Sequence, residues 1–319
     1  MSEVSQRLSR ANQVAVISHV HPDGDAVGSL SALTLALASL GKKVTPVLAD
    51  AVPESFLFIG VSTGTQLPGV EDVDLCVVLD APDMSRTGRT EEIRAFAAAG
   101  KLVMIDHHPA GDLRKASLAS IYNTEASSCA ELLFDVIVDL GARITPEIAT
   151  ALLVGMYTDT GGFQQSNTTS RVLEQASELL KRGAKLQKIV HELHRHQSVA
   201  HLKLTGIALE RIATFEKGMV TASYLTHEDL VGVGAVSDDC TGIIGELNVL
   251  PGSQWALLII EETPGNLRGI LRTAEDSNLP VNRLARLLGG GGHPRASGFS
   301  LPGRIAQTAE GWQLVAPEA

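Results

Sequence analysis

Acidic and histidine residues follow several apolar runs of this sequence. The runs cover residues 14–17, 73–79, 102–105 and 149–157, and the polar residues that follow them are His19, Asp23, Asp25, Asp80, Asp106, His107 and Asp159. Most of these residues fall just after a predicted buried strand of a parallel sheet, and ligands bind at the carboxyl ends of such strands. Carboxylates that converge there would repel one another strongly unless cations lay between them. The spacing therefore predicts a metal site.

The predicted ligands indicate which ions and which reaction to expect. Carboxylate oxygens suit hard divalent cations, and added imidazole nitrogens favour Mn²⁺ over Mg²⁺ or Ca²⁺. The set is too large for one ion, whereas two ions about 3.5–4 Å apart, bridged by a carboxylate and a water, would use it fully. Such a pair predicts hydrolysis of a phosphate ester or anhydride. An isolated D-x-D is more often a turn or a helix cap, but that explanation does not cover the joint occurrence of these residues.

The composition limits the classes of partner. The chain has 319 residues, enough for two domains, and 44% of them are hydrophobic. A net charge of −10 argues against a broad basic face for long nucleic acid, and 4% aromatic residues argue against a platform that stacks many bases. Cys76, Cys129 and Cys240 predict reduced thiols in a cytoplasmic protein. Without a secretory signal or an apolar run of roughly 18 residues, we expect a soluble protein that binds no membrane.

Alternating strand and helix patterns predict an α/β fold. In the N-terminal part we expect strands at 14–18, 44–48, 73–79 and 102–105, and helices at 26–40, 90–99, 127–140, 146–157 and 169–182. Residues 185–210 are polar with a helical pattern, which indicates a connector between domains. A second sheet is predicted by strands at 219–225, 255–261 and 266–273, followed by a helix at 280–288.

The motifs resemble those of the DHH phosphoesterase superfamily. His19-x-x-x-Asp23-x-Asp25, Asp80, Asp106-His107-His108 and Asp159 stand in the order of that family's four motifs. Residues 290–298, GGGHPRASG, are similar to the signature of the DHH-associated C-terminal domain. The motifs together span about residues 19–298, and the chain is most similar to the nanoRNase/pAp-phosphatase group.

This resemblance implies a domain organisation. Residues 1–186 would form the metal-binding catalytic domain with a parallel sheet, and residues 187–214 a helical connector. Residues 215–319 would form a smaller substrate-binding α/β domain with a mixed sheet. The active site would lie in the cleft between the domains, and the protein would be a homodimer.

The resemblance also implies a role for each motif residue. One metal ion would be held by His19, Asp23 and Asp80, and a second by Asp25, His107 and Asp159, with Asp80 bridging the two. Asp106 would orient a ligand, and His108 would donate a hydrogen bond or a proton to the substrate. The ions are expected to be Mn²⁺, with Mg²⁺ or Co²⁺ as alternatives.

Substrate-binding residues are expected mainly in the second domain. Arg272 resembles the arginine that binds a nucleotide phosphate in this family. The remaining candidates are Gly291, Gly292 and His293 in a glycine run, together with Arg86 and Arg295. Glycines allow close approach of the backbone to a ligand. For Arg86 and Arg295 a surface position without function is the commoner explanation.

The activity implied by the resemblance is hydrolysis of short nucleotides. Substrates would be short RNA or DNA oligonucleotides, cleaved from the 5′ end, adenosine 3′,5′-bisphosphate (pAp), and cyclic or linear dinucleotides, but no long duplex. Two alternatives stay open, an inorganic pyrophosphatase of the same superfamily and a non-catalytic nucleotide sensor. The residues do not decide the preferred substrate, the direction of degradation, the physiological metal or the oligomeric state.

Overall fold

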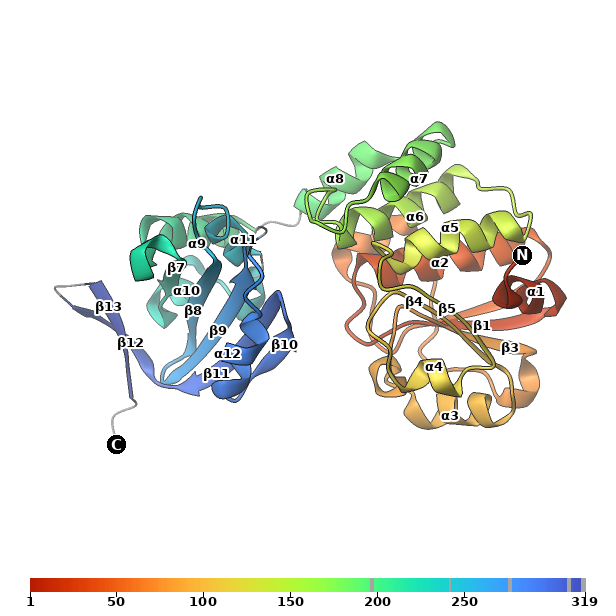
Figure 1. Ribbon diagram of the computed structural model, residues 1–319, viewed down its shortest axis with the longest axis horizontal. Helices are drawn as coiled ribbons and strands as arrows, with labels where there is room; N and C mark the ends of the chain where they lie inside the picture. The colour runs from red at the N-terminus through yellow and green to blue at the C-terminus, as the bar shows by residue number, and fades with distance from the viewer. Residues whose placement is uncertain (196–197, 241, 275–276, 309–310, 317–319) are drawn as a thin grey trace. The chain divides into compact units, whose positions relative to one another are not determined.

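The computed structural model of the protein describes residues 1–195, 198–240, 242–274, 277–308 and 311–316. The chain divides into two compact units, Met1–His196 and Gln197–Ala319. Each unit has its own sheet and its own hydrophobic core (Figure 1).

The first unit contains a five-stranded sheet in the order β2-β1-β3-β4-β5, in which all neighbouring strands run parallel. Its strands are β1 (Gln13–Ile17), β2 (Lys43–Val47), β3 (Leu75–Leu79), β4 (Leu102–Asp106) and β5 (Ala119–Tyr122). Every residue of β3 and β4 is buried, which explains their uninterrupted apolar sequence. The expected strands are present, and β5 is an additional short strand at the sheet edge.

Helices cover both faces of this sheet (Figure 1). One face shares a core with α1 (Glu3–Arg10), α2 (Gly24–Ser39), α5 (Cys129–Asp139), α6 (Pro146–Asp159), α7 (Ser170–Lys181) and α8 (Leu186–Arg195). The other face is covered by α3 (Thr90–Ala98) and α4 (Asp112–Ala116), which bury Phe96 and Leu113. The first unit is therefore a three-layer α/β structure, as the alternating sequence pattern predicts.

The helices α2 and α6 approach each other closely because glycines stand where they touch. A Cβ atom at Gly28 would collide with the backbone oxygen of Ala151, and one at Gly24 with the side chain of Thr158. On the other helix, a Cβ atom at Gly155 would collide with the carboxylate of Asp25. This contact places the start of α2 next to the end of α6.

The second unit contains a six-stranded mixed sheet in the order β10-β11-β9-β8-β7-β6, in which only β7 and β8 pair in parallel. Its strands are β6 (Ala213–Phe215), β7 (Val220–Leu225), β8 (Trp255–Thr263), β9 (Asn266–Thr273), β10 (Gly291–His293) and β11 (Ala296–Pro302). A separate hairpin is formed by β12 (Arg304–Thr308) and β13 (Gly311–Val315). This confirms the expected α/β fold with a second, mixed sheet.

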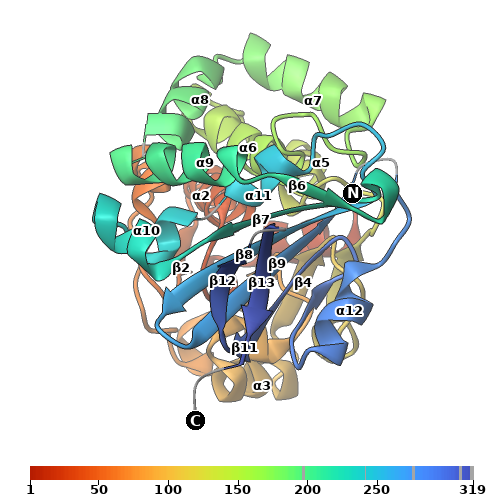
Figure 2. The ribbon, with the colours of Figure 1, turned by 90° about the vertical axis from the view of Figure 1, so that its left-hand side faces the viewer.

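Helices also pack against the second sheet (Figure 2). One core contains residues of α9 (Val199–Glu210), α10 (His227–Val233) and α11 (Ile243–Leu247). The opposite core contains α12 (Val281–Leu287) and the hairpin residue Trp312. None of the helices in the described ranges is both long and apolar enough to cross a bilayer.

The segment 187–214, expected as a connector, holds two helices. Ile189 of α8 is buried in the core of the first unit. Leu204 and Ala208 of α9 are buried in the core of the second unit. The polar sequence of this segment reflects helices that each bury only a narrow face.

Substitution of Gly28 by alanine should destabilise the first unit. The added methyl group would force α2 away from α6, and overpacking of this kind costs about 1–3 kcal/mol. Denaturant unfolding followed by circular dichroism would measure the loss. As a control, Gly206→Ala in α9 meets no atom within 4 Å and should instead stabilise its helix by about 0.8 kcal/mol. A Gly28→Ala protein as stable as the wild type would contradict the proposed close contact.

Candidate metal centre

The motif residues of the first unit lie where three parallel strands end. His19 follows β1, Asp80 directly follows β3, and Asp106 is the last residue of β4. These strands are neighbours in the sheet, so their carboxyl ends meet at one edge. Asp80 has a φ of 56°, a left-handed conformation that aspartate tolerates better than most residues. A strained residue of this kind is often found at a functional site.

The start of α2 adds two aspartates to this edge. Asp23 caps the helix, and its Oδ1 accepts hydrogen bonds from the amides of Asp25 and Ala26, both at 3.0 Å. The side chain of Asp23 is 57% exposed, whereas Asp25 is fully buried. One oxygen of Asp23 is thus fixed by the helix, and the other is accessible from solvent.

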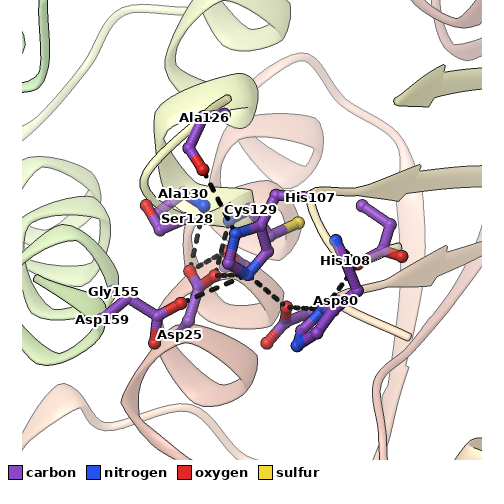
Figure 3. A network of polar contacts seen from close by, with 12 residues as sticks. Asp25, Asp80, His107, His108, Ala126, Ser128, Cys129, Ala130, Gly155 and Asp159 are labelled. Atoms are coloured by element: carbon purple, nitrogen blue, oxygen red, sulfur yellow. Dashed lines mark hydrogen bonds and ion pairs between the residues drawn. The ribbon is translucent and has the colours of Figure 1, made fainter. Parts of the chain in front are cut away.

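The buried Asp25 carboxylate is held by the start of another helix (Figure 3). Its oxygens accept hydrogen bonds from the amides of Cys129 at 2.5 Å and Ala130 at 2.9 Å, at the beginning of α5. The hydroxyl of Ser29 donates a third bond at 3.0 Å. Helix starts carry unpaired amides and a partial positive charge, so they stabilise a buried anion. Ser29 stands one helical turn after Asp25, and the sequence analysis overlooked it.

Asp80 lies between the histidines of two different motifs. Its Oδ2 is 3.5 Å from Nε2 of His19, and its Oδ1 is 3.4 Å from Nε2 of His107. The Nδ1 atoms of both rings face backbone oxygens, that of Val20 at 2.8 Å for His19 and that of Ala126 at 3.3 Å for His107. Such bonds place the proton on Nδ1 and leave Nε2 as the atom that can bind a metal.

His107 also faces the two carboxylates from the helices (Figure 3). Its Nε2 is 3.2 Å from Oδ2 of Asp159, the last residue of α6, and 3.9 Å from Oδ2 of Asp25. Asn167 holds the end of α6 in place, since its side-chain amide donates to the backbone oxygens of Asp159 and Ser127 at 3.0 and 3.2 Å. Nothing in the sequence marks Asn167, because its partners come from two separate segments.

Several buried atoms at this edge lack hydrogen-bond partners. They are Asp80 Oδ1, Asp106 Oδ2 and His107 Nε2. Buried polar atoms nearly always have hydrogen-bond partners, so these three atoms without partners indicate a site for a bound group. A cation would satisfy the carboxylate oxygen and the ring nitrogen together, and the oxygen and nitrogen donors suit a divalent transition metal.

Three overlapping sets of side chains could hold a metal ion. Within each set the ligand atoms lie within 4.8 Å of one another, and the sets are His19-Asp23-Asp80, Asp25-His107-Asp159 and Asp80-His107-His108. Asp80 belongs to two of them, with its two oxygens directed at different histidines. The six ligands expected from the motifs therefore lie together at one edge of the sheet.

The electrostatics of the two inner histidines reflect the surrounding negative charge. Burial lowers the pKa of His107, but its contacts with Asp159 and Asp80 outweigh this effect and raise the pKa to about 12. Burial likewise lowers the pKa of His19, and the carboxylates of Asp23 and Asp80 raise it to about 10. Without a metal, protons on these rings supply the positive charge that the carboxylates require.

The carboxylates divide into two groups. Burial and the charge of Asp80 raise the pKa of Asp25 well above its usual value, and they raise that of Asp159 to about 6. Burial also raises the pKa of Asp80, but hydrogen bonding to the neighbouring histidines dominates and lowers it far below its usual value. The neighbouring histidines therefore favour the ionised form of Asp80.

Asp106 contacts His108 and belongs to none of the three ligand sets. The buried Oδ1 of Asp106 lies 2.9 Å from Nδ1 of His108 and also accepts from the His108 amide at 3.2 Å. The Nδ1 atom of His108 is 3.5 Å from Oδ1 of Asp80. The geometry agrees with the orienting role that the resemblance implies for Asp106.

Comparison with known proteins identifies the family. The sequence profile of the DHH family, N-terminal domain, matches residues 13–156. A Thermus thermophilus protein named bifunctional oligoribonuclease and PAP phosphatase NrnA is 31% identical over 290 residues, which cover 91% of this chain and 84% of that protein. The chain belongs to the DHH family. The resemblance found in the motifs is thereby confirmed.

Further comparisons extend over both units of this DHH-family protein. A Bacillus subtilis protein of the same name is 26% identical, and the alignment covers 94% of this chain and 93% of that protein. A solved structure of an exopolyphosphatase-related protein from Bacteroides fragilis has a TM-score of 0.80 and 26% identity, covering 93% of this chain and 89% of that one. The similarity to these proteins therefore extends over both units of the chain.

The predicted substrate residues of the DHH-family protein have different environments. Arg272 lies in β9, where burial lowers the pKa of its guanidinium, and no ion pair to it is found among the described residues. Arg295 is exposed and donates to the backbone oxygen of Ala274 at 3.0 Å, and Arg86 is exposed in the first unit. The side chain of His293 lies outside the described part of the structure.

The glycine run has a structural explanation at two of its positions. Cβ atoms at Gly290 and Gly292 would collide with the backbone of β11. A Cβ atom at Gly291 would meet nothing within 4 Å, so packing does not explain a glycine at this position. The sequence analysis expected the glycine backbone to approach a ligand closely. At Gly290 and Gly292 the backbone instead approaches the neighbouring strand β11.

Metal binding should compete with protons at this centre. The pKa values of His107 and His19 in the folded protein exceed the unfolded value of about 6.5. Their contribution to folding is complete below that pH and is lost as the pH rises toward the folded values. The melting temperature of the chelator-treated protein should therefore fall between pH 6.5 and pH 9, and added Mn²⁺ should raise it more at pH 9. Scanning fluorimetry would measure both effects; an equal Mn²⁺ increment at the two pH values would exclude competition.

Proposed function

We propose that this DHH-family protein is a metal-dependent phosphoesterase that hydrolyses short oligoribonucleotides from the 5′ end and pAp, and also cyclic or linear dinucleotides. The observation that carries the proposal is the group of overlapping ligand sets around Asp80 at the carboxyl edge of the sheet. The names of the Thermus thermophilus and Bacillus subtilis relatives support the substrate class, because their alignments cover most of both chains.

Two divalent ions, most suitably Mn²⁺, would occupy the ligand sets. His19, Asp23 and Asp80 would hold one ion, and Asp25, His107 and Asp159 would hold the other, with the two oxygens of Asp80 serving both. When bound, the ions lower the pKa of a shared water and neutralise charge on the phosphoryl group. The protein orients the ligands beforehand through the amides at the start of α5 and the backbone oxygens behind the histidines.

His108 is the proposed proton donor to the leaving oxygen. Asp106 holds the proton on Nδ1 of its ring, which fixes the ring orientation. Because the contact with Asp106 occupies Nδ1, Nε2 is the ring atom that would carry the proton for transfer. Asp106 itself is buried, so it acts through His108.

Substrate selection is assigned to both charge and shape. Arg272 in β9 is the proposed phosphate ligand of the second unit. Gly291 in β10, where a Cβ atom would meet nothing within 4 Å, is a second proposed contact to the substrate. A net charge of −10 supports short substrates over long duplexes. The resemblance alone supports a homodimer, and the three unpaired, buried cysteines support a reducing compartment such as the cytoplasm.

The alternative of an inorganic pyrophosphatase has less support. The Thermus thermophilus and Bacillus subtilis relatives are named for oligoribonucleotides and PAP, and neither name includes pyrophosphate. A non-catalytic sensor would not need the full set of candidate ligands, so the grouping of all six candidates within two of the sets supports an enzyme.

An Asp80→Asn variant should lose hydrolysis of all substrates by at least about a thousandfold, because the bridging charge is removed. The assay would compare pAp, a trinucleotide, a long RNA and pyrophosphate in Mn²⁺ and in chelator. The control is Asp74→Asn, a similar change before the amino end of the same strand, which should keep full activity. If the wild-type protein cleaved pyrophosphate alone, the pyrophosphatase alternative would be favoured. If it turned over none of these substrates, the sensor alternative would be favoured.

An Asp106→Asn variant should separate proton transfer from metal binding. An amide in place of the carboxylate would no longer hold the His108 ring by a charge-assisted hydrogen bond, so kcat should fall about a hundredfold or more. The Mn²⁺ affinity, measured by calorimetry, should change less than about threefold, because Asp106 belongs to none of the ligand sets. Loss of metal binding in this variant would place Asp106 among the ligands instead.

A further inference from the structure

A pocket borders the loop that follows the Asp106-His107-His108 motif. Its volume is about 530 Å³, and it is lined by Ala110, Gly111, Asp112, Arg114 and Lys115. Ligand pockets typically measure about 300–1,000 Å³, so this one has room for a nucleotide portion of a substrate. None of the motif residues lines it, so it is distinct from the metal centre.

The two cations of this pocket have no anionic partner. Arg114 and Lys115 are exposed, and within the described ranges neither forms an ion pair or donates a hydrogen bond. The one acid that lines the pocket, Asp112, is engaged elsewhere, because its Oδ1 accepts from the amide of Met84 at 2.8 Å. In a chain with a net charge of −10, unpaired cations beside the reaction centre are available to an anionic ligand.

The pocket is fixed to the loop that carries Asp80. The amide of Asp112 donates to Oδ1 of Asp83 at 2.9 Å, and a Cβ atom at Gly111 would collide with Asp83 and with the backbone oxygen of Pro82. The start of α4 is therefore packed tightly against the residues that directly follow Asp80. The pocket wall cannot move far without disturbing that loop.

Arg114 stacks on Tyr122, a residue of the strand next to the one that carries Asp106. The guanidinium of Arg114 lies 4.2 Å from the ring centre of Tyr122, at the end of β5. Tyr122 pairs with Asp106 in the parallel register of β4 and β5, and neighbouring strands are about 4.8 Å apart. Paired residues point to the same face of the sheet, so Arg114 is stacked on the side where Asp106 holds His108. The stacking also restrains the long arginine side chain before any ligand binds.

We propose that Arg114 and Lys115 form a phosphate-binding subsite for a short oligonucleotide, taking a phosphate other than the one that is hydrolysed. This inference rests on the proposed function and adds a specificity determinant to it. The guanidinium and the ammonium attract phosphate in any base sequence, so the subsite selects for chain length and not for base identity. A substrate with one phosphate would gain nothing from it.

The test compares kinetics on a trinucleotide and on bis(p-nitrophenyl) phosphate, which has a single phosphate. In the double variant R114Q/K115Q, KM for the trinucleotide should rise about tenfold with kcat within about twofold. The slope of log KM against log salt should decrease by about 1, as expected for lost phosphate contacts. Hydrolysis of the single-phosphate reporter should not change, and the charge-conserving R114K/K115R should restore most of the trinucleotide KM.

The matched control is R10Q/K43Q, which removes the same charge at the end of α1 and at the amino end of β2, away from the carboxyl edge. Its KM for the trinucleotide should stay within about twofold of the wild type. An unchanged KM in R114Q/K115Q, an equal loss on the reporter, or an equal loss in the control would overturn the subsite. A wild-type protein that cleaves the reporter but no trinucleotide would instead overturn the proposed function.

Discussion

The accumulation of buried negative charge at one edge of the first sheet is the constraint on which the rest of this structure depends. Asp80 is buried there beside His19 and Asp25 beside His107, and Asp106 is buried against His108. Ionised carboxylates this close together are unfavourable in a low-dielectric site unless positive charge lies among them. Protons on the imidazoles supply that charge in the absence of metal, and bound metal ions would replace them. Stability, metal affinity and pH response are therefore linked through the same few side chains.

The fold meets this constraint with parts that are rigid for independent reasons. Three parallel strands end at the same edge, the start of α5 offers its amides to Asp25, and small residues let α2 and α6 meet. His19 and His107 are each oriented by a backbone oxygen that contacts the Nδ1 atom of the ring. Ligands arranged in advance lose little entropy when a metal binds, which favours both affinity and a defined geometry for catalysis. The same rigidity explains why Asp80 can keep an unusual backbone conformation.

Charge also governs how an acidic protein can act on an anionic substrate. The net charge of −10 repels nucleic acid at long range, so productive binding requires local cations. In the first unit the proposed cations are Arg114 and Lys115, and in the second unit the proposed cation is Arg272, which is half-buried without an ion-pair partner among the residues described. A few cations at defined places bind a few phosphates, whereas a long duplex would bring many phosphates against an acidic surface. This distribution agrees with short substrates.

The parallel sheet and the candidate ligands could be predicted from the sequence alone, because buried parallel strands are uninterrupted apolar runs and several of the candidate ligands follow them directly. The sequence did not reveal β5 or α1, since a four-residue edge strand and a helix that buries only two apolar side chains, Val4 and Leu8, give a weak pattern. Only the tertiary structure showed that Ser29 and Asn167 support the ligands and that Gly290 and Gly292 pack on β11. These roles depend on partners brought together by folding, and local residue patterns carry no record of which distant segment lies opposite.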